Sequence, residues 1–216
     1  MYVPGRGARL RDELPLTRRD FTEVREALKD LPTLETDRLS LRKMTLDDAE
    51  AVFAYASDTE VSRYTLWERH HSIKDSRAFL ELVIQKYENG GEPDWGIVYK
   101  GDHRFVGACG LVNWETEHAR AEVGFVLSRE YWGRGLMPEA VRALISFGFE
   151  RMNLNRVEAR CIAENVASAR VMEKAGMACE GTLRQREYIK GAYRDINVYG
   201  ILKKQYRGAR GPLRPG

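Results

Sequence analysis

The chain has 216 residues, 43% hydrophobic and 31% charged, and its 35 Lys and Arg against 32 Asp and Glu leave a net charge of +3 at pH 7. These values exclude a wholly disordered chain and argue against a general nucleic-acid binder, which needs a strong basic field. The three cysteines form no C-x-x-C pair, and the chain has neither a membrane-length apolar stretch nor a secretory signal. We therefore expect a soluble cytoplasmic protein without a metal site, membrane contact or direct nucleic-acid binding.

The two ends of the chain differ in composition from its middle. Residues 203–216 carry Lys and Arg but no acid, together with several Gly and Pro. The first 33 residues mix charges with Pro and Gly, and apolar residues at helical spacing predict a short helix over Thr17 to Leu31. We expect an N-terminal extension over 1–33, a domain over 34–203 and a flexible basic tail over 204–216.

Within the expected domain, apolar residues recur with the period of a helix in some segments and of a strand in others. Helices are predicted at about 45–56, 74–87, 137–151 and 167–175. Strands are predicted at 38–42, 95–100, 105–114, 119–127, 156–162, 181–189 and 193–202. The order βααβββαβαββ indicates an α/β fold with a mixed, mostly antiparallel central sheet flanked by helices.

The turn Trp132-Gly-Arg-Gly135 joins a predicted strand directly to a predicted helix. Glycines let the backbone approach a ligand closely, and the first amides of a helix are unpaired at its positive end. This combination suits a pyrophosphate. The dinucleotide fingerprint fails because Pro138 stands where a third glycine is needed, and the chain has no Walker Gly-Lys-Ser/Thr sequence. A plain tight turn before a helix is the alternative interpretation.

The same turn resembles the acetyl-CoA loop of the GNAT N-acetyltransferases, Arg/Gln-x-x-Gly-x-Gly/Ala, with Glu130 in place of Arg or Gln at the first position. The stretch from Tyr131 to Ala140 is similar to the branch of this family that includes the RimJ/RimL-type protein N-terminal acetyltransferases. A second likeness to that branch lies at Asn165-Val-Ala-Ser168, followed by Met172-Glu-Lys-Ala-Gly-Met177. The resemblance covers about residues 34–203 and implies the GNAT fold.

The resemblance implies that acetyl-CoA, the acetyl donor, binds where the strand 122–127 splays from the strand 156–162. The pantetheine arm would pair with the backbone of Phe125, Val126 and Leu127, as an added strand does. The pyrophosphate would be held by amides of Gly133, Arg134, Gly135, Leu136 and Met137. Asn165 and Ser168 are expected near the CoA sulfur. No metal is implied, since the amine attacks the thioester directly.

Two proton transfers need residues of the chain. The attacking amine must lose a proton, and Glu122 is the expected base, acting directly or through water. An ion pair of Glu122 with Arg120 or Arg160 is the alternative. Many family members protonate the leaving thiolate with a tyrosine, but Met172 stands at that position. Ser168 is therefore expected to stabilise the thiolate or relay a proton; the alternative is a hydroxyl that only starts a helix, with Asn165 as its N-cap.

The acceptor pocket is expected between the two early helices, in a segment that holds Tyr64 and Trp67 as candidate substrate-binding residues. The alternative places Trp67 in the core and leaves His70 and His71 solvated. We expect an acetyl-CoA-dependent N-acetyltransferase whose acceptor is a protein N-terminal amine. A small-molecule amine (polyamine, amino sugar or amino-acid derivative) and a non-catalytic CoA-binding regulatory module are the alternatives. A homodimer is compatible with the sequence.

Overall fold

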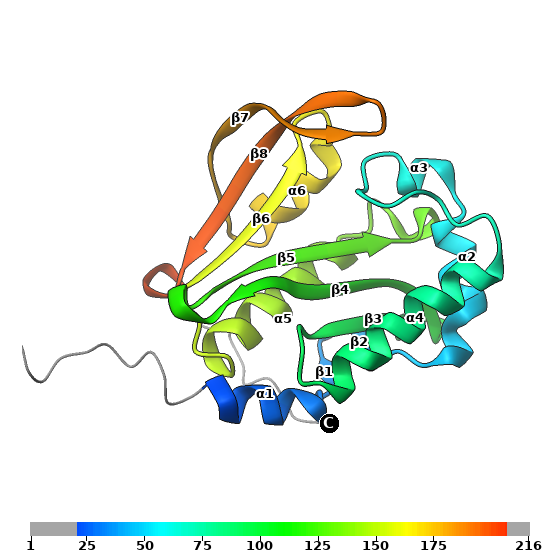
Figure 1. Cartoon of the computed structure of the whole chain (residues 1–216), viewed down its shortest axis with the longest axis horizontal. Coiled ribbons are helices and arrows are strands. Elements are labelled where there is room, and N and C mark those ends of the chain that lie inside the picture. The colour runs from blue at the N-terminus through cyan, green and yellow to red at the C-terminus, as the bar shows by residue number, and fades with distance from the viewer. Residues whose placement is uncertain (1–20, 207–216) are drawn as a thin grey trace, which may run out of the picture.

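An eight-stranded sheet organises residues 21–206, the part of the chain that the computed structural model describes (Figure 1). The strands are β1 (Leu34–Glu35), β2 (Leu39–Arg42), β3 (Asp94–Tyr99), β4 (Arg104–Glu115), β5 (Arg120–Leu127), β6 (Arg156–Ile162), β7 (Ala178–Ile189) and β8 (Ala192–Leu202). Their spatial order is β1-β2-β3-β4-β5-β6-β8-β7. Neighbours pair antiparallel except β5 and β6, which are parallel.

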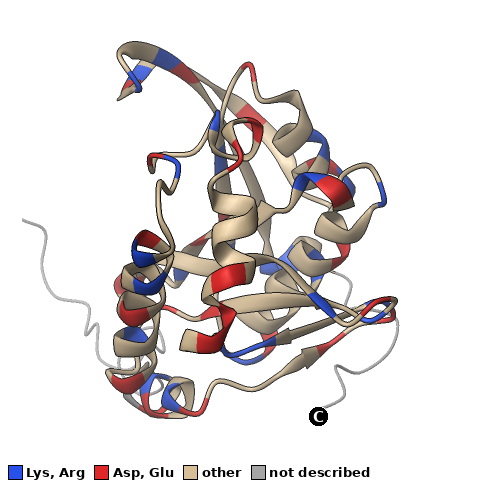
Figure 2. Ribbon diagram, turned by 90° about the vertical axis from the view of Figure 1, so that its right-hand side faces the viewer, with Lys and Arg blue, Asp and Glu red and all other residues tan. Residues whose placement is uncertain are grey.

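Helices cover both faces of this sheet (Figure 1). They are α1 (Phe21–Lys29), α2 (Ala49–Ala56), α3 (Thr59–Ser62), α4 (Ile73–Glu88), α5 (Leu136–Glu150) and α6 (Val166–Lys174). In Figure 1, α4 lies in front of the central strands with α2 beside it at the right, and α5 and α6 lie behind the sheet. Acidic and basic residues are interspersed along these elements (Figure 2). Between residues 21 and 206, no helix combines the length and the apolar character needed to cross a bilayer.

The predicted mixed, mostly antiparallel α/β fold is confirmed, and the order βααβββαβαββ is found with short additions. β1 has two residues and α3 has four, which is too few for a hydrophobic period to emerge. Helix α1 lies inside the helix expected from Thr17, whose first four residues fall outside the described residues. The rest of the expected extension before residue 21, and the tail from 207 onward, also lie outside them.

Helix α1 and the segment that follows it pack into the main core of the protein. Leu28 and Leu31 are only 3% and 5% exposed and join the same apolar cluster as the central strands. The indole of Trp95, which is fully buried, donates a 2.8 Å hydrogen bond to the carbonyl of Pro32. Phe21 meets Trp114 edge to face, with ring centroids 5.6 Å apart. The residues before β1 therefore contribute directly to the packed structure.

Strands β5 and β6 are paired over only three residues. Their register runs from Arg120 opposite Arg156 to Glu122 opposite Glu158 and stops there. Beyond that point β5 remains paired with β4 as far as Leu127, and β6 remains paired with β8 as far as Ile162. Each strand follows its other neighbour, so a gap opens between them, as Figure 1 shows.

Candidate functional site

The glycine turn lies at the start of α5, beside the open end of β5. Gly133 and Gly135 both have φ of +74°, and Gly135 is the N-cap of the helix. A Cβ atom on Gly133 would meet nothing within 4 Å, and one on Gly135 would meet only the Arg38 guanidinium, at 3.6 Å. The main chain of the turn is therefore accessible at the positive end of α5. This arrangement fits the diphosphate of a CoA donor.

Arg38, the residue just before β2, braces the turn. Its guanidinium donates to the carbonyl of Arg134 at 2.9 Å and to that of Gly135 at 3.0 Å. The C=O and N–H of a trans peptide point in opposite directions. These bonds therefore direct the amides of Gly135 and Leu136 away from Arg38. Sequence reasoning missed Arg38, because its partners lie almost 100 residues further along the chain.

Glu139, in the first turn of α5, holds Arg38 in place. The carboxylate accepts hydrogen bonds from Arg38 Nε at 2.7 Å, from the Arg38 amide at 2.9 Å and from Thr36 Oγ1 at 2.6 Å. Burial would raise the pKa of Glu139, but the hydrogen bonds from Thr36 and Arg38 outweigh it and lower the pKa below its ordinary value. The ionised carboxylate thus fixes the arginine that orients the turn.

The edge of β5 from Val123 to Leu127 faces the gap. Within residues 21–206, no strand pairs with this edge, since β6 leaves it after Glu122. Phe125 and Val126 are half-buried there, and the indole N–H of Trp132 donates to the Leu127 carbonyl at 2.8 Å. The Trp132 bond ties the glycine turn to the end of the strand. An extended ligand arm could pair with this edge and reach the turn.

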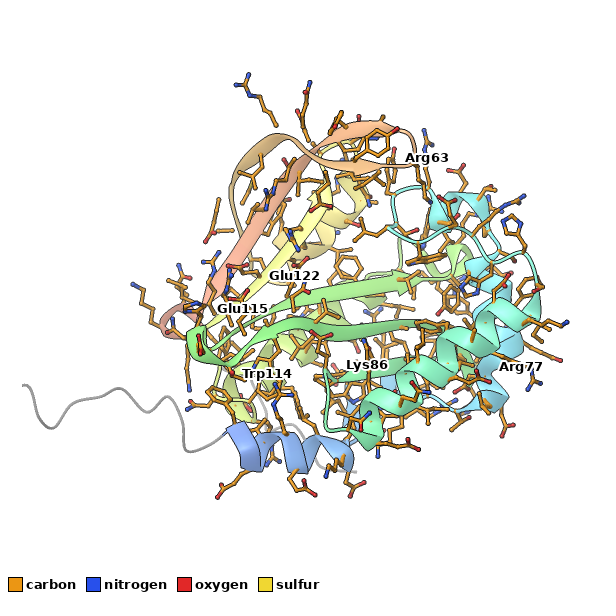
Figure 3. All side chains as sticks on the ribbon, viewed as in Figure 1. Arg63, Arg77, Lys86, Trp114, Glu115 and Glu122 are labelled. Carbon is orange, nitrogen blue, oxygen red and sulfur yellow. The ribbon has the colours of Figure 1, made fainter. Side chains whose placement is uncertain are left out.

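Glu122 lies where the gap begins (Figure 3). Its Oε2 atom accepts hydrogen bonds from Arg160 Nε at 2.9 Å and from Asn113 Nδ2 at 3.2 Å, and lies 2.7 Å from Arg160 Nη2. The hydrogen bond to Glu122 raises the pKa of Arg160. Of the two expected partners, Arg160 is therefore the one found. Oε1 accepts no hydrogen bond from the described residues, so one carboxylate oxygen stays available to a proton.

Arg120, the other candidate partner of Glu122, binds different carboxylates. It donates to Glu115 at 2.6 Å and to Glu158 at 3.2 Å. The Arg160 guanidinium also reaches Glu187 on β7, at 3.3 Å. Glu187 was not singled out from the sequence, because its place beside β6 depends on the pairing of three strands. Ion pairs therefore line the face of the sheet where the gap begins.

Asn165 and Ser168 form a cap at the start of α6. The Asn165 Oδ1 atom accepts from the Ser168 amide at 3.2 Å, and Asn165 Nδ2 donates to Ser168 Oγ at 2.9 Å. Asn165 is therefore the N-cap of α6, as the alternative interpretation expects. A hydroxyl that accepts one hydrogen bond keeps its own proton, so Ser168 can still donate to another group. Met172, one turn further on, is fully buried in the core.

The two candidate acceptor residues lie in different surroundings. Tyr64 packs against the small apolar cluster of Ile162, Ile189 and Ile196. Trp67 packs against the main core, 5.7 Å from the ring of His70. His70 is half-buried rather than solvated and shares a 2.8 Å hydrogen bond with Ser76, and burial lowers its pKa. Trp67 and Tyr64 therefore pack against different apolar clusters.

A cavity of about 250 Å³ lies beside Tyr64, between the residues that follow α3 and the β7–β8 hairpin. Its lining consists of Arg63, Tyr64, Ile162, Glu164, Ile189, Lys190 and Arg194. Apart from Tyr64, sequence reasoning had singled out none of these residues. They come from three separate parts of the chain, so only the tertiary structure brings them together.

Comparisons with known proteins agree with this geometry. Residues 38–178 match the acetyltransferase (GNAT) domain family. The chain is 37% identical over 172 residues to "Uncharacterized N-acetyltransferase YoaA" of Bacillus subtilis, covering 80% of this chain and 97% of that one. It is 35% identical over 178 residues to "Uncharacterized N-acetyltransferase p20" of Bacillus licheniformis, covering 82% and 100%.

A solved structure shares both the sequence and the fold of this chain. The GNAT-family acetyltransferase from Bacillus anthracis is 31% identical, with a TM-score of 0.72, and the match covers 80% of this chain and 99% of that one. The splayed strands and the glycine turn thus occur in a chain that resembles acetyltransferases over most of its length. The chain belongs to the GNAT acetyltransferase family and is an N-acetyltransferase.

Proposed function

We propose that this N-acetyltransferase acetylates the N-terminal amine of a protein, with acetyl-CoA as the donor. The observation that carries the donor assignment is the glycine turn at the N-terminus of α5. Arg38 binds the carbonyls of this turn and so directs its amides away from the Arg38 side chain. When bound, acetyl-CoA supplies an acetyl thioester. The amides of Gly133 to Met137 hold its pyrophosphate, and the β5 edge from Phe125 to Leu127 binds the pantetheine arm. Two proteins of similar fold support this, the RimL acetyltransferase in complex with CoA and MccE in complex with acetyl-CoA and AMP.

Glu122 is the base in this proposal. Arg160 and Asn113 fix the carboxylate through Oε2, and the other oxygen takes the proton of the incoming amine, directly or through a water molecule. Because the ion pair joins β5 to β6 where the gap begins, the base is held at the place where donor and acceptor would meet. The Ser168 hydroxyl can donate a hydrogen bond to the departing sulfur and so stabilise the thiolate or relay a proton from water to it, while Asn165 fixes the position of the hydroxyl.

The names of two relatives suggest different acceptors. "Putative ribosomal N-acetyltransferase YdaF" of Bacillus subtilis is 28% identical over 168 residues, and "Spermidine N(1)-acetyltransferase" of Escherichia coli is 28% identical over 170 residues. A polyamine site needs carboxylates to bind a polycation. The cavity beside Tyr64 instead has three cationic side chains and one carboxylate in its lining. This charge supports the protein N-terminus over the polyamine.

We also propose that the acetyltransferase domain spans residues 34–203, as the sequence suggests, with α1 packed against it. The family match at 38–178 and the pairing of β8 with β6, which extends to Leu202, support these bounds.

The test is acetyl transfer to a panel of amines. Peptides with free N-terminal residues, the same peptides with blocked N-termini, and spermidine are each incubated with acetyl-CoA, and release of free thiol is followed with time. We expect thiol release with the free peptides and a mass increase of one acetyl group at the N-terminal residue. Transfer to spermidine alone would assign the small-molecule function. Binding of CoA without thiol release for any amine would assign the regulatory module instead.

A further inference from the structure

The cavity beside Tyr64 has an excess of positive charge. Arg63, Lys190 and Arg194 line it together with a single carboxylate, Glu164. Arg194 Nη1 lies 3.4 Å from Glu164 Oε1, so this pair is largely neutralised. Arg63 lies 3.6 Å from Glu60, which is outside the lining, and both side chains are well exposed. An exposed pair of that kind is weak. Arg63 therefore remains available to a stronger anionic partner.

Lys190 is the least compensated of the three cations. Its Nζ donates to the backbone carbonyl of Ser62, which joins the hairpin turn to α3. In the described part of the chain, no carboxylate lies within 4.0 Å of this ammonium, in contrast to Arg63 and Arg194. An ammonium carries three N–H donors, and the Ser62 carbonyl accepts one. Two donors can therefore bind an anion in the cavity.

The cavity lies on the face of the sheet opposite α6, and one residue of its wall is next in the chain to the cap of that helix. Cys161 belongs to the main core with Met172 of α6, whereas the next residue, Ile162, belongs to the small cluster with Tyr64. Successive strand residues point to opposite faces, so the cavity opens away from α6. Glu164 in its wall is next to Asn165, which caps α6 beside Ser168. A group in the cavity would therefore belong to the acceptor rather than to the donor.

The size and lining of the cavity limit what it can hold. About 250 Å³ is less than the roughly 300–1,000 Å³ of typical small-molecule sites. It suits one side chain of a longer ligand. Ile162, Ile189 and Tyr64 provide an apolar wall for methylene groups, and Lys190 and Arg63 provide donors for a carboxylate. Asp and Glu have this combination of a short apolar stem and an anionic end.

We propose that the cavity binds the carboxylate of an acidic residue close to the acetylated N-terminus of a protein acceptor. The proposal rests on the proposed function, and it specifies the substrate class as acidic N-terminal sequences. In the complex, Lys190 and Arg63 bind the carboxylate, and the N-terminal amine lies toward Glu122. A lysine-rich N-terminus is disfavoured by the same charges.

The experiment compares three peptides that all begin with Ala and differ only in residues 2 to 4. These three residues are all Glu in the first peptide, all Gln in the second and all Lys in the third. kcat/KM for each is measured by thiol release, and peptide binding without acetyl-CoA is measured by fluorescence anisotropy. Wild type is compared with Lys190→Gln, whose amide can still donate to the Ser62 carbonyl, and with Arg63→Gln. The matched control is Arg77→Gln on α4, an exposed arginine far from Arg63 in Figure 3. Melting temperatures show whether each variant folds.

We expect wild type to prefer the Glu peptide over the Gln peptide about tenfold, the ratio that one charge-assisted hydrogen bond produces. Lys190→Gln and Arg63→Gln reduce this ratio and the peptide affinity, and Arg77→Gln leaves both at wild-type values. High salt reduces the preference as well. Equal use of the three peptides by wild type would overturn the inference while the acetyltransferase function stands. Failure of CoA binding, or of thiol release with every peptide, would instead overturn the proposed function.

Discussion

The two sides of the gap between β5 and β6 are built from different parts of the polypeptide. In the proposed function, the donor side consists of backbone groups, the amides of the glycine turn and the edge of β5, and Arg38 fixes the direction of the turn amides. The proposed acceptor side consists of side chains from the residues after α3, from the end of β6 and the residues just after it, and from the β7–β8 hairpin. A backbone site changes only if the chain path changes, whereas a site made of side chains changes with single substitutions. The acceptor side can therefore diversify while the donor side stays the same.

The largest effect is expected at Glu122, which lies where the two sides meet. Glu122→Gln keeps one acceptor oxygen for Arg160 and Asn113 but removes the proposed base, so kcat should fall about a hundredfold. The loss should be greatest at low pH, because more of the amine is protonated there. The pH profile of kcat for both proteins measures this. A loss of the same size at every pH would contradict base catalysis by Glu122.

The next largest effect tests the donor side. Gly135→Val places a β-branched residue at φ of +74°, a conformation that costs such a residue about 1–3 kcal/mol. The turn should relax and misdirect its amides, so the Kd for CoA should rise about tenfold or more by titration calorimetry. Gly191→Val is the matched control, because Gly191 also has positive φ and lies in the hairpin turn. Equal CoA affinity in the two variants would contradict the assignment of the turn.

A smaller effect is expected from Arg38→Met, which removes the brace but leaves the turn sequence intact. Arg38 is 44% exposed, so solvent weakens its bonds, and the free energy of unfolding should fall by about 1–2 kcal/mol. The affinity for CoA should fall severalfold while KM for the peptide stays the same. Arg142→Met is the control, since Arg142, within residues 21–206, donates only to the Lys174 carbonyl, away from the turn. The brace has no role in binding if the two variants have equal CoA affinity.

The smallest effect concerns acid stability. The folded-state pKa of Glu139 is below its ordinary value of 4.5, so its contribution to stability is full above that value and is lost as the pH falls through the folded pKa. Glu139→Gln should be less stable than wild type at neutral pH. The difference in melting temperature should narrow as the pH falls below about 5. A difference that is constant over this range would show that the carboxylate charge does not support the brace.

The regular elements of the fold could be predicted because their apolar residues repeat with a clear period. Ala140, Val141, Leu144, Ile145 and Phe149 have helical spacing in the sequence, and all of them are buried on α5. In β5 the expected alternation holds at Ala121, Val123 and Leu127, but Phe125 is only half-buried. Phe125 lies where β6 has left the strand, so its neighbour on that side is missing. Local sequence does not show where two strands separate.

The candidate site was predictable to the extent that it is local in sequence. The glycine turn, its helix and the Asn165–Ser168 cap each occupy a few consecutive residues. Arg38 contacts residues 96 and 97 positions away, and the bond from Lys190 to Ser62 spans 128 positions. Arginine and lysine are common on surfaces, so no property of the sequence distinguishes these two from solvated residues. Contacts at such separations follow only from the tertiary structure.

The hydrogen bond between Trp95 and Pro32 bears on how the enzyme can be shortened for laboratory work. A truncated chain beginning at residue 38, where the family match starts, would lose the carbonyl that accepts the indole proton. It would also lose Leu28 and Leu31 and so uncover apolar surface on the central strands. Such a fragment should aggregate on expression, although every residue of the glycine turn and of the Asn165–Ser168 cap would still be present. Clones for crystallisation should therefore start before α1.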